Sequence, residues 1–255
     1  MNKDYLKIKE DLIKLGIKAG DKVIMHSSYK SLGEVEGGAM TLLNALKDVI
    51  TEDGILMLPT FTYDYVNAKN PIFDVRYTAS NTGYITEVFR KSEGVLRSVH
   101  PTHSFAVWGN DKEYYVKDHH KDQVCVAENS PIYKLMENGG KILMLGISTS
   151  NNTLIHGVEV VVKPPYFLAV DYSDPKYHRE YSCVDYDNNI HRQEFFHGFP
   201  DLMGWHGNFT KLNEICPMVT GEVFGAFSYL MDAKTVWDTA TKKMKEEPYF
   251  FVRPM

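Results

Sequence analysis

Three short, almost wholly apolar runs alternate with helix-like segments in the first two thirds of the chain, and this alternation most restricts the possible fold. The runs are KVIMHSS from residue 22, ILMLPTF from residue 55 and KILMLGI from residue 141. The segment GGAMTLLNALKDVI between the first two places apolar residues on one helical face, which predicts a strand–helix–strand unit with parallel strands. Further strand and helix patterns follow in HSFAVWG, TGYITEVFRKS and SPIYKLMENGG. The sequence therefore predicts an α/β fold, an α/β/α sandwich around a mainly parallel central sheet.

From about residue 164 the pattern changes. The segment YHREYSCVDYDNNIHRQEFFHG reads as two long strands with a turn at Asn188–Asn189. We expect a C-terminal antiparallel β extension over roughly residues 164–210, followed by a last helix in AKTVWDTATKKMKEE. No linker-like stretch interrupts the chain, so residues 1–255 are expected to form a single domain.

Bulk composition excludes several classes of protein. The chain has 255 residues, 44% of them hydrophobic, and a net charge of -5, whereas a nucleic-acid-binding face would be basic. No run approaches the ~18 apolar residues of a membrane span, and the amino-terminal segment reads as an amphipathic helix instead of a targeting peptide. The cysteines at 125, 183 and 216 lie far apart, which argues against a disulfide framework or a cysteine zinc site. A cytoplasmic protein is expected, and its oligomeric state stays open.

Ligands of parallel sheets gather beyond the carboxyl ends of the strands, and three loops there are rich in reactive side chains. The first, HSSYKSLGEVEGG at 26–38, offers His26, Ser27, Ser28 and Lys30, and its two glycines open a helix whose free N–H groups suit a phosphate. The spacing fits neither a Walker loop nor GxGxxG. The alternative is a polar loop before a capped helix.

The second loop, RSVHPTHSFAVWG at 97–109, brings together Arg97, Ser98, His100, His103 and Ser104. Its two histidines flank a Pro-Thr pair. They are either site residues or hydrogen-bonding residues that hold a turn.

The third loop, NNTLIHGVE at 151–159, carries His156 and Glu159 at a helix start. Residues three apart lie on the same side of a helix, so Glu159 can support the imidazole and fix its tautomer. Asn151 or Asn152 can cap this helix. The spacing alone also fits a partly buried histidine that a carboxylate merely satisfies.

In this order the three loops resemble the aminoglycoside 3-N-acetyltransferase family, often called antibiotic N-acetyltransferases. The matching segments are LGIKAGDKVIMHSSYKSLGEVEGGAMTLLNALKDVITEDGILMLPTFT, GVLRSVHPTHSFAVWG, ENSPIYKL and NNTLIHGVE, and MVTGEVFGAFSYLMDA matches more loosely. The resemblance implies a transferase that moves an acetyl group from acetyl-CoA, or another acyl-CoA, to an amine of an amino sugar. It also implies that His156 is the catalytic base and Glu159 its partner.

Further residue roles follow from the resemblance together with the loop positions. The residues assigned to acyl-CoA are His26, Ser27, Ser28, Lys30, Leu32, Gly33, Ser104, Phe105 and Ala106. The residues assigned to the acceptor are Tyr63, Asp64, His103, Asn152 and Thr153. None of the three cysteines lies in these loops, so direct attack by the amine is favoured over a cysteine relay.

The sequence indicates the acyl donor more clearly than it indicates the amine acceptor. The stretch PTFTYDYVNAKNPIFDVRYTASNTG is shorter and less acidic than in family members that act on antibiotics, although Asp64 and Asp74 can meet a cation. The alternative acceptor is a nucleotide-linked amino sugar of surface-polysaccharide synthesis, with Tyr63, Tyr65 or Phe73 stacking on it. A non-catalytic acyl-CoA-binding protein is the third reading, disfavoured by the presence of both His156 and Glu159.

No metal site is predicted in the histidine- and aspartate-rich region 171–206. The region contains no HxH or HExxH spacing. Its candidate ligands are His178, His191, His197, His206, Asp171, Asp174, Asp185 and Asp187.

Overall fold

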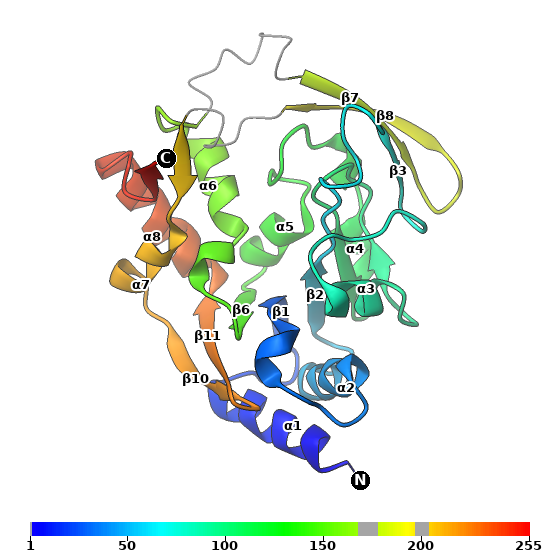
Figure 1. The fold of residues 1–255 in the computed structure, drawn as a ribbon, viewed down its shortest axis with the longest axis vertical. Helices are drawn as coiled ribbons and strands as arrows, with labels where there is room; N and C mark the ends of the chain where they lie inside the picture. Colours follow the sequence, from blue (N-terminus) through cyan, green and yellow to red (C-terminus); the bar gives the residue numbers. More distant parts are fainter. Residues whose placement is uncertain (1, 168–177, 197–203) are drawn as a thin grey trace.

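The computed structural model describes residues 2–167, 178–196 and 204–255, and its main feature is a central sheet between two layers of helices (Figure 1). Within these residues the sheet has seven strands in the order β10-β11-β6-β1-β2-β5-β4. Their bounds are β1 Lys22–Ser27, β2 Ile55–Pro59, β4 Leu96–Arg97, β5 Phe105–Trp108, β6 Lys141–Leu145, β10 Val219–Val223 and β11 Ala226–Asp232.

The three apolar runs form the parallel centre of this sheet. Strand β1 pairs parallel with both β2 and β6, whereas β11 and β5 pair antiparallel to β6 and β2. Strands β10 and β4 are antiparallel to β11 and β5, so they run in the same direction as the central three. Five of the seven strands thus share one direction, which confirms a mainly parallel sheet.

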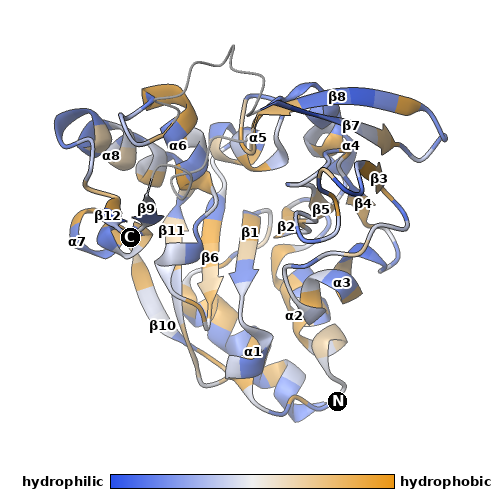
Figure 2. Cartoon of the chain, turned by 45° about the horizontal axis from the view of Figure 1, so that its top comes forward, coloured by the Kyte–Doolittle hydropathy of each residue, from blue (hydrophilic) through white to orange (hydrophobic). Residues whose placement is uncertain are grey.

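Helices cover both faces, as an α/β/α sandwich requires. Their bounds are α1 Lys3–Leu15, α2 Ala39–Ile50, α3 Tyr84–Arg90, α4 Lys112–Val116, α5 Pro131–Glu137, α6 Leu154–Val162, α7 Leu212–Ile215 and α8 Ala233–Glu246. Side chains alternate across a strand: Val23 and Met25 pack with α1, α2 and α3, whereas Ile24 packs with α5, α6 and α8. Figure 2 shows the resulting hydrophobic stretch along β6. The helices that the sequence predicted in these segments are confirmed.

The predicted antiparallel extension is present as the hairpin of β7 (His178–Val184) and β8 (Ile190–Phe196). Its loop spans Asp185–Asn189, and Asn188 lies in the left-handed region at φ 64°. Because Asp185 N–H donates to Asn189 O, the turn consists of Tyr186–Asn188 and the predicted turn at Asn188–Asn189 is wrong in position. Strand β3 (Ile72–Asp74) joins β7 in parallel, and β9 (Trp205–Gly207) pairs with β12 (Val252–Pro254). Figure 1 shows the hairpin at the end of the molecule opposite the N-terminus.

Short 3-10 helices complete the loops: η1 Tyr29–Leu32, η2 His119–Lys121, η3 Thr149–Asn151 and η6 Phe209–Lys211. No helix in the described ranges has the length and apolarity needed to cross a membrane. Cys125, Cys183 and Cys216 are buried free thiols.

Arg97 is a structural residue of the second loop. Its side chain is 1% exposed, and its guanidinium donates hydrogen bonds to Thr60 O (2.7 Å), Thr78 O (2.6 Å) and Ser104 Oγ (2.9 Å). The guanidinium also lies 4.9 Å from the centre of the Phe73 ring. Arg97 therefore joins the end of β2 to the segments around residues 78 and 104.

Replacing this guanidinium should destabilise the fold. Arg97→Met leaves Thr78 O without its donor and removes one of the two donors to Thr60 O, so we expect the free energy of unfolding to fall by about 2–4 kcal/mol. Urea denaturation measures the change. The control Arg253→Met, at an exposed position of β12, should stay within about 0.5 kcal/mol. Equal effects of the two substitutions would contradict the structural role of Arg97.

Candidate active site

The ends of β1, β2 and β6 open into one cavity of about 490 Å³. Because these strands are parallel, their carboxyl ends meet at one edge of the sheet. Seven of the residues that the sequence singled out line this cavity: His26, Ser27, Tyr63, His103, Asn152, Thr153 and His156. The structure therefore brings parts of all three predicted loops together.

His156 and Glu159 form the most defined pair in the cavity wall. Both lie on α6, and His156 Nδ1 is 2.7 Å from Glu159 Oε2. The imidazole is 24% exposed, whereas the Glu159 side chain is fully buried. Since Nδ1 donates to the carboxylate, the neutral imidazole is the tautomer that carries its lone pair on Nε2. This nitrogen can accept a proton. The ring also packs edge-on against Phe209, with the ring centres 5.2 Å apart.

Local sequence explains why α6 begins where it does. Asn152 Oδ1 accepts the backbone N–H of Leu154 at 3.2 Å, which satisfies a free donor of the first turn, as predicted. Gly157 allows close packing behind the pair, because an added Cβ would lie 2.7 Å from Val126 and 2.8 Å from Trp237 on α8. The helix is thereby held with His156 toward the cavity.

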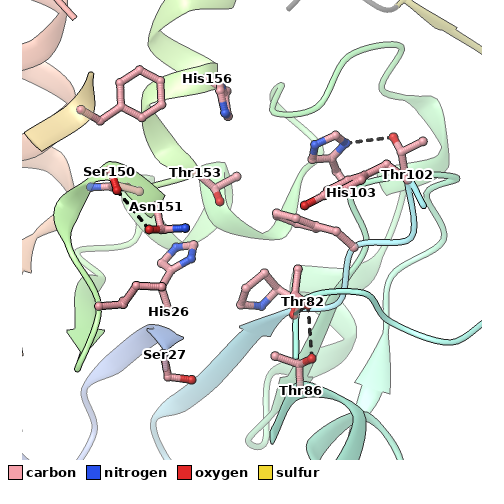
Figure 3. A pocket seen from close by; sticks show the side chains of 16 residues that line it. His26, Ser27, Thr82, Thr86, Thr102, His103, Ser150, Asn151, Thr153 and His156 are labelled. Carbon is pink, nitrogen blue, oxygen red and sulfur yellow. Dashed lines mark hydrogen bonds between the residues drawn. The ribbon is translucent and has the colours of Figure 1, made fainter. Parts of the chain in front are cut away.

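Three buried polar atoms at the strand ends have no hydrogen-bond partner among the described residues. They are His26 Nε2, Ser27 Oγ and Asn152 Nδ2. Such atoms cost about 1–3 kcal/mol each when they stay unpaired, so they mark places where a ligand group can bind. Figure 3 shows His26 beside Asn151, with Thr153 between His26 and His156.

The opposite wall is aromatic and hydroxyl-rich. His103 is 5% exposed, its Nδ1 lies 2.9 Å from Thr102 Oγ1, and its ring centre is 4.7 Å from that of Phe61. Tyr63 is half exposed at the rim of the cavity. Thr82 and Thr86 line the same space from the segment around the start of α3 (Figure 3).

Sequence reasoning missed several lining residues. They are Pro59, Phe61, Thr82, Thr86, Thr102, Ile147, Ser150 and Phe209, and Asn151 was considered only as a cap. The four-residue spacing of Thr82 and Thr86 across a helix start was a usable signal. Phe209 comes from η6, far along the chain, and no local pattern indicated it.

Other residues assigned to acyl-CoA lie away from the cavity wall. Ser104, Phe105 and Ala106 are fully buried, and Ser104 Oγ donates to Thr60 O at 2.8 Å. Leu32 is buried in the core beside α2, Lys30 is exposed on η1, and Ser28 precedes η1. Gly33 borders a surface hollow with Glu34 and Glu36.

Among the acceptor candidates, Asp64 is exposed outside the cavity lining and Asp74 pairs with Arg76 at 3.4 Å. Tyr65 is half exposed. Phe73 is fully buried in a small core with Val66 and Tyr181, so its proposed stacking on an acceptor is wrong.

Among the described residues no group of three or more His, Cys, Asp or Glu side chains is arranged to hold a metal ion. His178 instead lies 2.7 Å from Glu194, and His191 lies 2.8 Å from Asp185. Asp187 and His206 are exposed. The candidates Asp171, Asp174 and His197 lie outside the described residues.

Comparisons with known proteins agree on one family. The model of the family described as aminoglycoside 3-N-acetyltransferase matches residues 24–245. The SPbeta prophage-derived aminoglycoside N(3')-acetyltransferase-like protein YokD of Bacillus subtilis (strain 168) is 32% identical over 188 residues, 66% of this chain and 68% of its own length. Aminoglycoside N(3)-acetyltransferase VII of Streptomyces paromomycinus is 32% identical over 186 residues, 66% of this chain and 64% of its own length. The aligned part thus spans about two thirds of these relatives.

Solved structures share the fold over nearly the whole chain. A histidine-to-alanine mutant of aminoglycoside acetyltransferase AAC(3)-IVa, in complex with gentamicin, superposes with a TM-score of 0.79 at 22% identity, covering 98% of this chain and 91% of that one. The structure of YokD from Bacillus subtilis gives 0.78 at 25% identity, covering 97% and 95%. AAC-IIIb in a binary complex with CoASH gives 0.77 at 23% identity, covering 98% of each chain.

The burial of His26 predicts a dependence of stability on pH. Burial lowers the pKa of His26 to about 4, whereas an unfolded histidine titrates near ~6.5. As the pH falls below ~6.5 the unfolded chain binds this proton first, so the fold loses stability until about pH 4. His26→Gln should remove about 1–2 kcal/mol of the loss in unfolding free energy between pH 7 and pH 5, measured by urea denaturation. His206→Gln, at an exposed position, is the control; an unchanged loss in His26→Gln would contradict the prediction.

Proposed function

The chain belongs to the aminoglycoside 3-N-acetyltransferase family, whose named members are acyltransferases, and on that premise we propose that it transfers an acetyl group from acetyl-CoA to an amine of an amino sugar. An aminoglycoside is the first acceptor class to consider. The lining residues run from His26 to Phe209 in one cavity, and we propose that residues 1–255 act as one catalytic unit.

The observation that carries this proposal is the pair of His156 and Glu159. A protonated amine cannot attack a thioester, so a base must first remove a proton, and histidine is the side chain most often used for such proton transfer. Glu159 accepts from Nδ1 at 2.7 Å, which leaves Nε2 to take the proton of the amine. The buried carboxylate then stabilises the imidazolium that forms.

The transfer balances without a further reactant. An ammonium first gives its extra proton to the imidazole, which releases it to solvent. The neutral amine nitrogen then bonds to the acetyl carbon as the C–S bond breaks, the imidazole takes the proton that this nitrogen loses on becoming an amide, and the leaving thiolate receives that proton from the imidazolium. Charge that develops on the carbonyl oxygen needs hydrogen-bond donors. Asn152 offers one: its Oδ1 is used by Leu154 N–H, so its Nδ2, buried and without a partner among the described residues, is the donor end.

The residues around β1 fit an acyl-CoA. Ser27 Oγ and His26 Nε2 are buried polar atoms at the cavity that have no hydrogen-bond partner in the part of the chain that the structure describes, and both residues lie shortly before the 3-10 helix η1. We propose that this loop, including Ser28 and Lys30, contacts the coenzyme. Acetyl-CoA, when bound, supplies the activated acyl group. Leu32, Ser104, Phe105 and Ala106 support the loop and strand from the core instead of contributing side chains to the cavity.

The acceptor wall also supports a second acceptor class, a nucleotide-linked amino sugar. The rings of Phe61 and Tyr63 can stack on a sugar or base, and the hydroxyls of Thr82, Thr86 and Thr102 can bind sugar hydroxyls. His103 and Thr153 complete this wall beside the proposed base. Asp64, exposed outside the cavity lining, is retained only as a contact for a larger acceptor.

Thiol release from acetyl-CoA tests the reaction and the acceptor together. We expect acceptor-dependent turnover with kanamycin-type aminoglycosides, assayed in parallel with nucleotide-linked 3- and 4-amino sugars. Turnover with the nucleotide-linked sugars alone would assign the second acceptor class. Tight coenzyme A binding without turnover on a broad panel of amines would identify a binding protein and reject the proposal.

Removal of the base should reduce the chemical step. His156→Ala is expected to lower kcat by at least ~10²-fold, because general base catalysis typically contributes that much or more. The control His206→Ala removes an exposed imidazole and should leave kcat unchanged. Near-normal turnover in His156→Ala, with coenzyme A binding intact, would remove His156 from the mechanism.

A further inference from the structure

Both carboxylate oxygens of Glu159 accept hydrogen bonds, and the second donor is a residue that lies outside the cavity. Oε2 accepts from His156 Nδ1 at 2.7 Å, and Oε1 accepts from the Tyr166 hydroxyl at 3.1 Å. Glu159 is fully buried and Tyr166 is 1% exposed. A buried carboxylate is stable only when such donors compensate its lost hydration. Tyr166, Glu159 and His156 therefore form one continuous hydrogen-bonded chain.

The chain segment after α6 is shaped to bring Tyr166 back to this helix. Lys163 adopts a left-handed conformation at φ 53°, and two prolines follow it. The turn is closed by a hydrogen bond from Phe167 N to Pro164 O at 2.9 Å. On its outer side the Tyr166 ring packs near Tyr249, with ring centres 6.0 Å apart. The turn at Pro164–Phe167 and the packing against Tyr249 together fix the position of the Tyr166 hydroxyl.

Among the described residues, the groups nearest to the Glu159 carboxylate other than His156 and Tyr166 carry no charge. The Cys125 thiol is buried next to Glu159, and burial, reinforced by the Glu159 carboxylate, raises its pKa, so it stays neutral. Burial and the same carboxylate also raise the pKa of Tyr166, which therefore remains a hydroxyl donor. Phe209 covers His156 from η6 and carries no charge.

We propose that Tyr166 is a positioning residue of the catalytic base, acting through the carboxylate of Glu159. This inference rests on the function proposed above. The hydroxyl holds Oε1, so that Oε2 faces His156 and keeps the imidazole in one tautomer. It also shares the negative charge of the carboxylate, which limits how strongly Glu159 favours the imidazolium. Tyr166 thereby keeps His156 able to release its proton to the leaving thiolate.

Because the Tyr166 hydroxyl shares the negative charge of Glu159, the direction in which its removal changes the protonation of His156 can be predicted. Without the hydroxyl, the carboxylate attracts the imidazolium more strongly, so the histidine keeps its proton to higher pH. In Tyr166→Phe we expect the NMR titration midpoint of the His156 imidazole to rise by about half a unit or more. The acidic limb of the kcat/KM profile should move the same way. kcat should fall about 3- to 30-fold, less than for loss of the base itself, with little change in KM for acetyl-CoA.

Two further variants separate positioning from simple packing. Tyr115→Phe removes the hydroxyl of another buried tyrosine, on α4, and should leave the midpoint and the profile unchanged. In a Glu159→Gln background the carboxylate charge is absent, so adding Tyr166→Phe should no longer move the midpoint. A further movement there would mean that Tyr166 acts by some other route and would overturn the proposal.

The outcomes distinguish this inference from the proposed function. An unmoved His156 midpoint in folded Tyr166→Phe, with only the melting temperature lowered, would overturn the positioning role even if the wild type turns over. A raised midpoint in a protein that acetylates no amine would support the coupling of the three residues and would reject the function. If Tyr166→Phe does not fold, 3-fluorotyrosine at position 166 decides: its more acidic hydroxyl binds Oε1 more strongly, so the His156 midpoint must fall, and an unmoved midpoint would overturn the positioning role.

Discussion

A buried carboxylate constrains the whole site. Glu159 lies on the inner side of α6 with no exposed surface, and a charge in that position must be met by hydrogen-bond donors. His156 supplies one donor from inside the same helix, and Tyr166 supplies the other from the turn that follows it. The hydrogen bond from His156 Nδ1 to this carboxylate therefore fixes the orientation of the imidazole at the cavity. In the mechanism that we propose, the same interaction that permits the burial of Glu159 also prepares His156 to accept a proton.

The sheet brings the other polar side chains of the cavity close to the proposed base. Because β6, β1 and β2 are parallel neighbours, the loops that leave them converge on one cavity although they are far apart in sequence. The donor side that we propose lies at His26 and Ser27, and the aromatic wall of Phe61 and His103 lines the same cavity. Arg97 holds this wall through hydrogen bonds to Thr60 and Ser104. One buried guanidinium and one buried carboxylate thus position the two sides of the site.

Local periodicity was sufficient to predict much of this arrangement. The apolar runs and helical patterns gave the parallel centre of the sheet, and the three-residue spacing on a helix placed His156 beside Glu159. The site predictions that were wrong or incomplete depended on contacts that local sequence patterns do not specify. Ser104 looks like a site residue in the sequence, yet its hydroxyl is used by Thr60 and Arg97. Phe209 and Tyr166 reach the site only through turns whose direction no local pattern specifies, and β10 and β11 extend the sheet beside β6 by pairing across more than 80 residues.

The position of the thioester relative to His156 tests the central claim most directly. A crystal structure with coenzyme A and an amine acceptor would show it. The account predicts that the sulfur lies in the cavity between His26 and His156, with room for an amine nitrogen to approach both Nε2 and the acetyl carbon to about 3–3.5 Å. A sulfur bound elsewhere, for example in the surface groove beside Tyr5, Lys47 and Trp108, would contradict it.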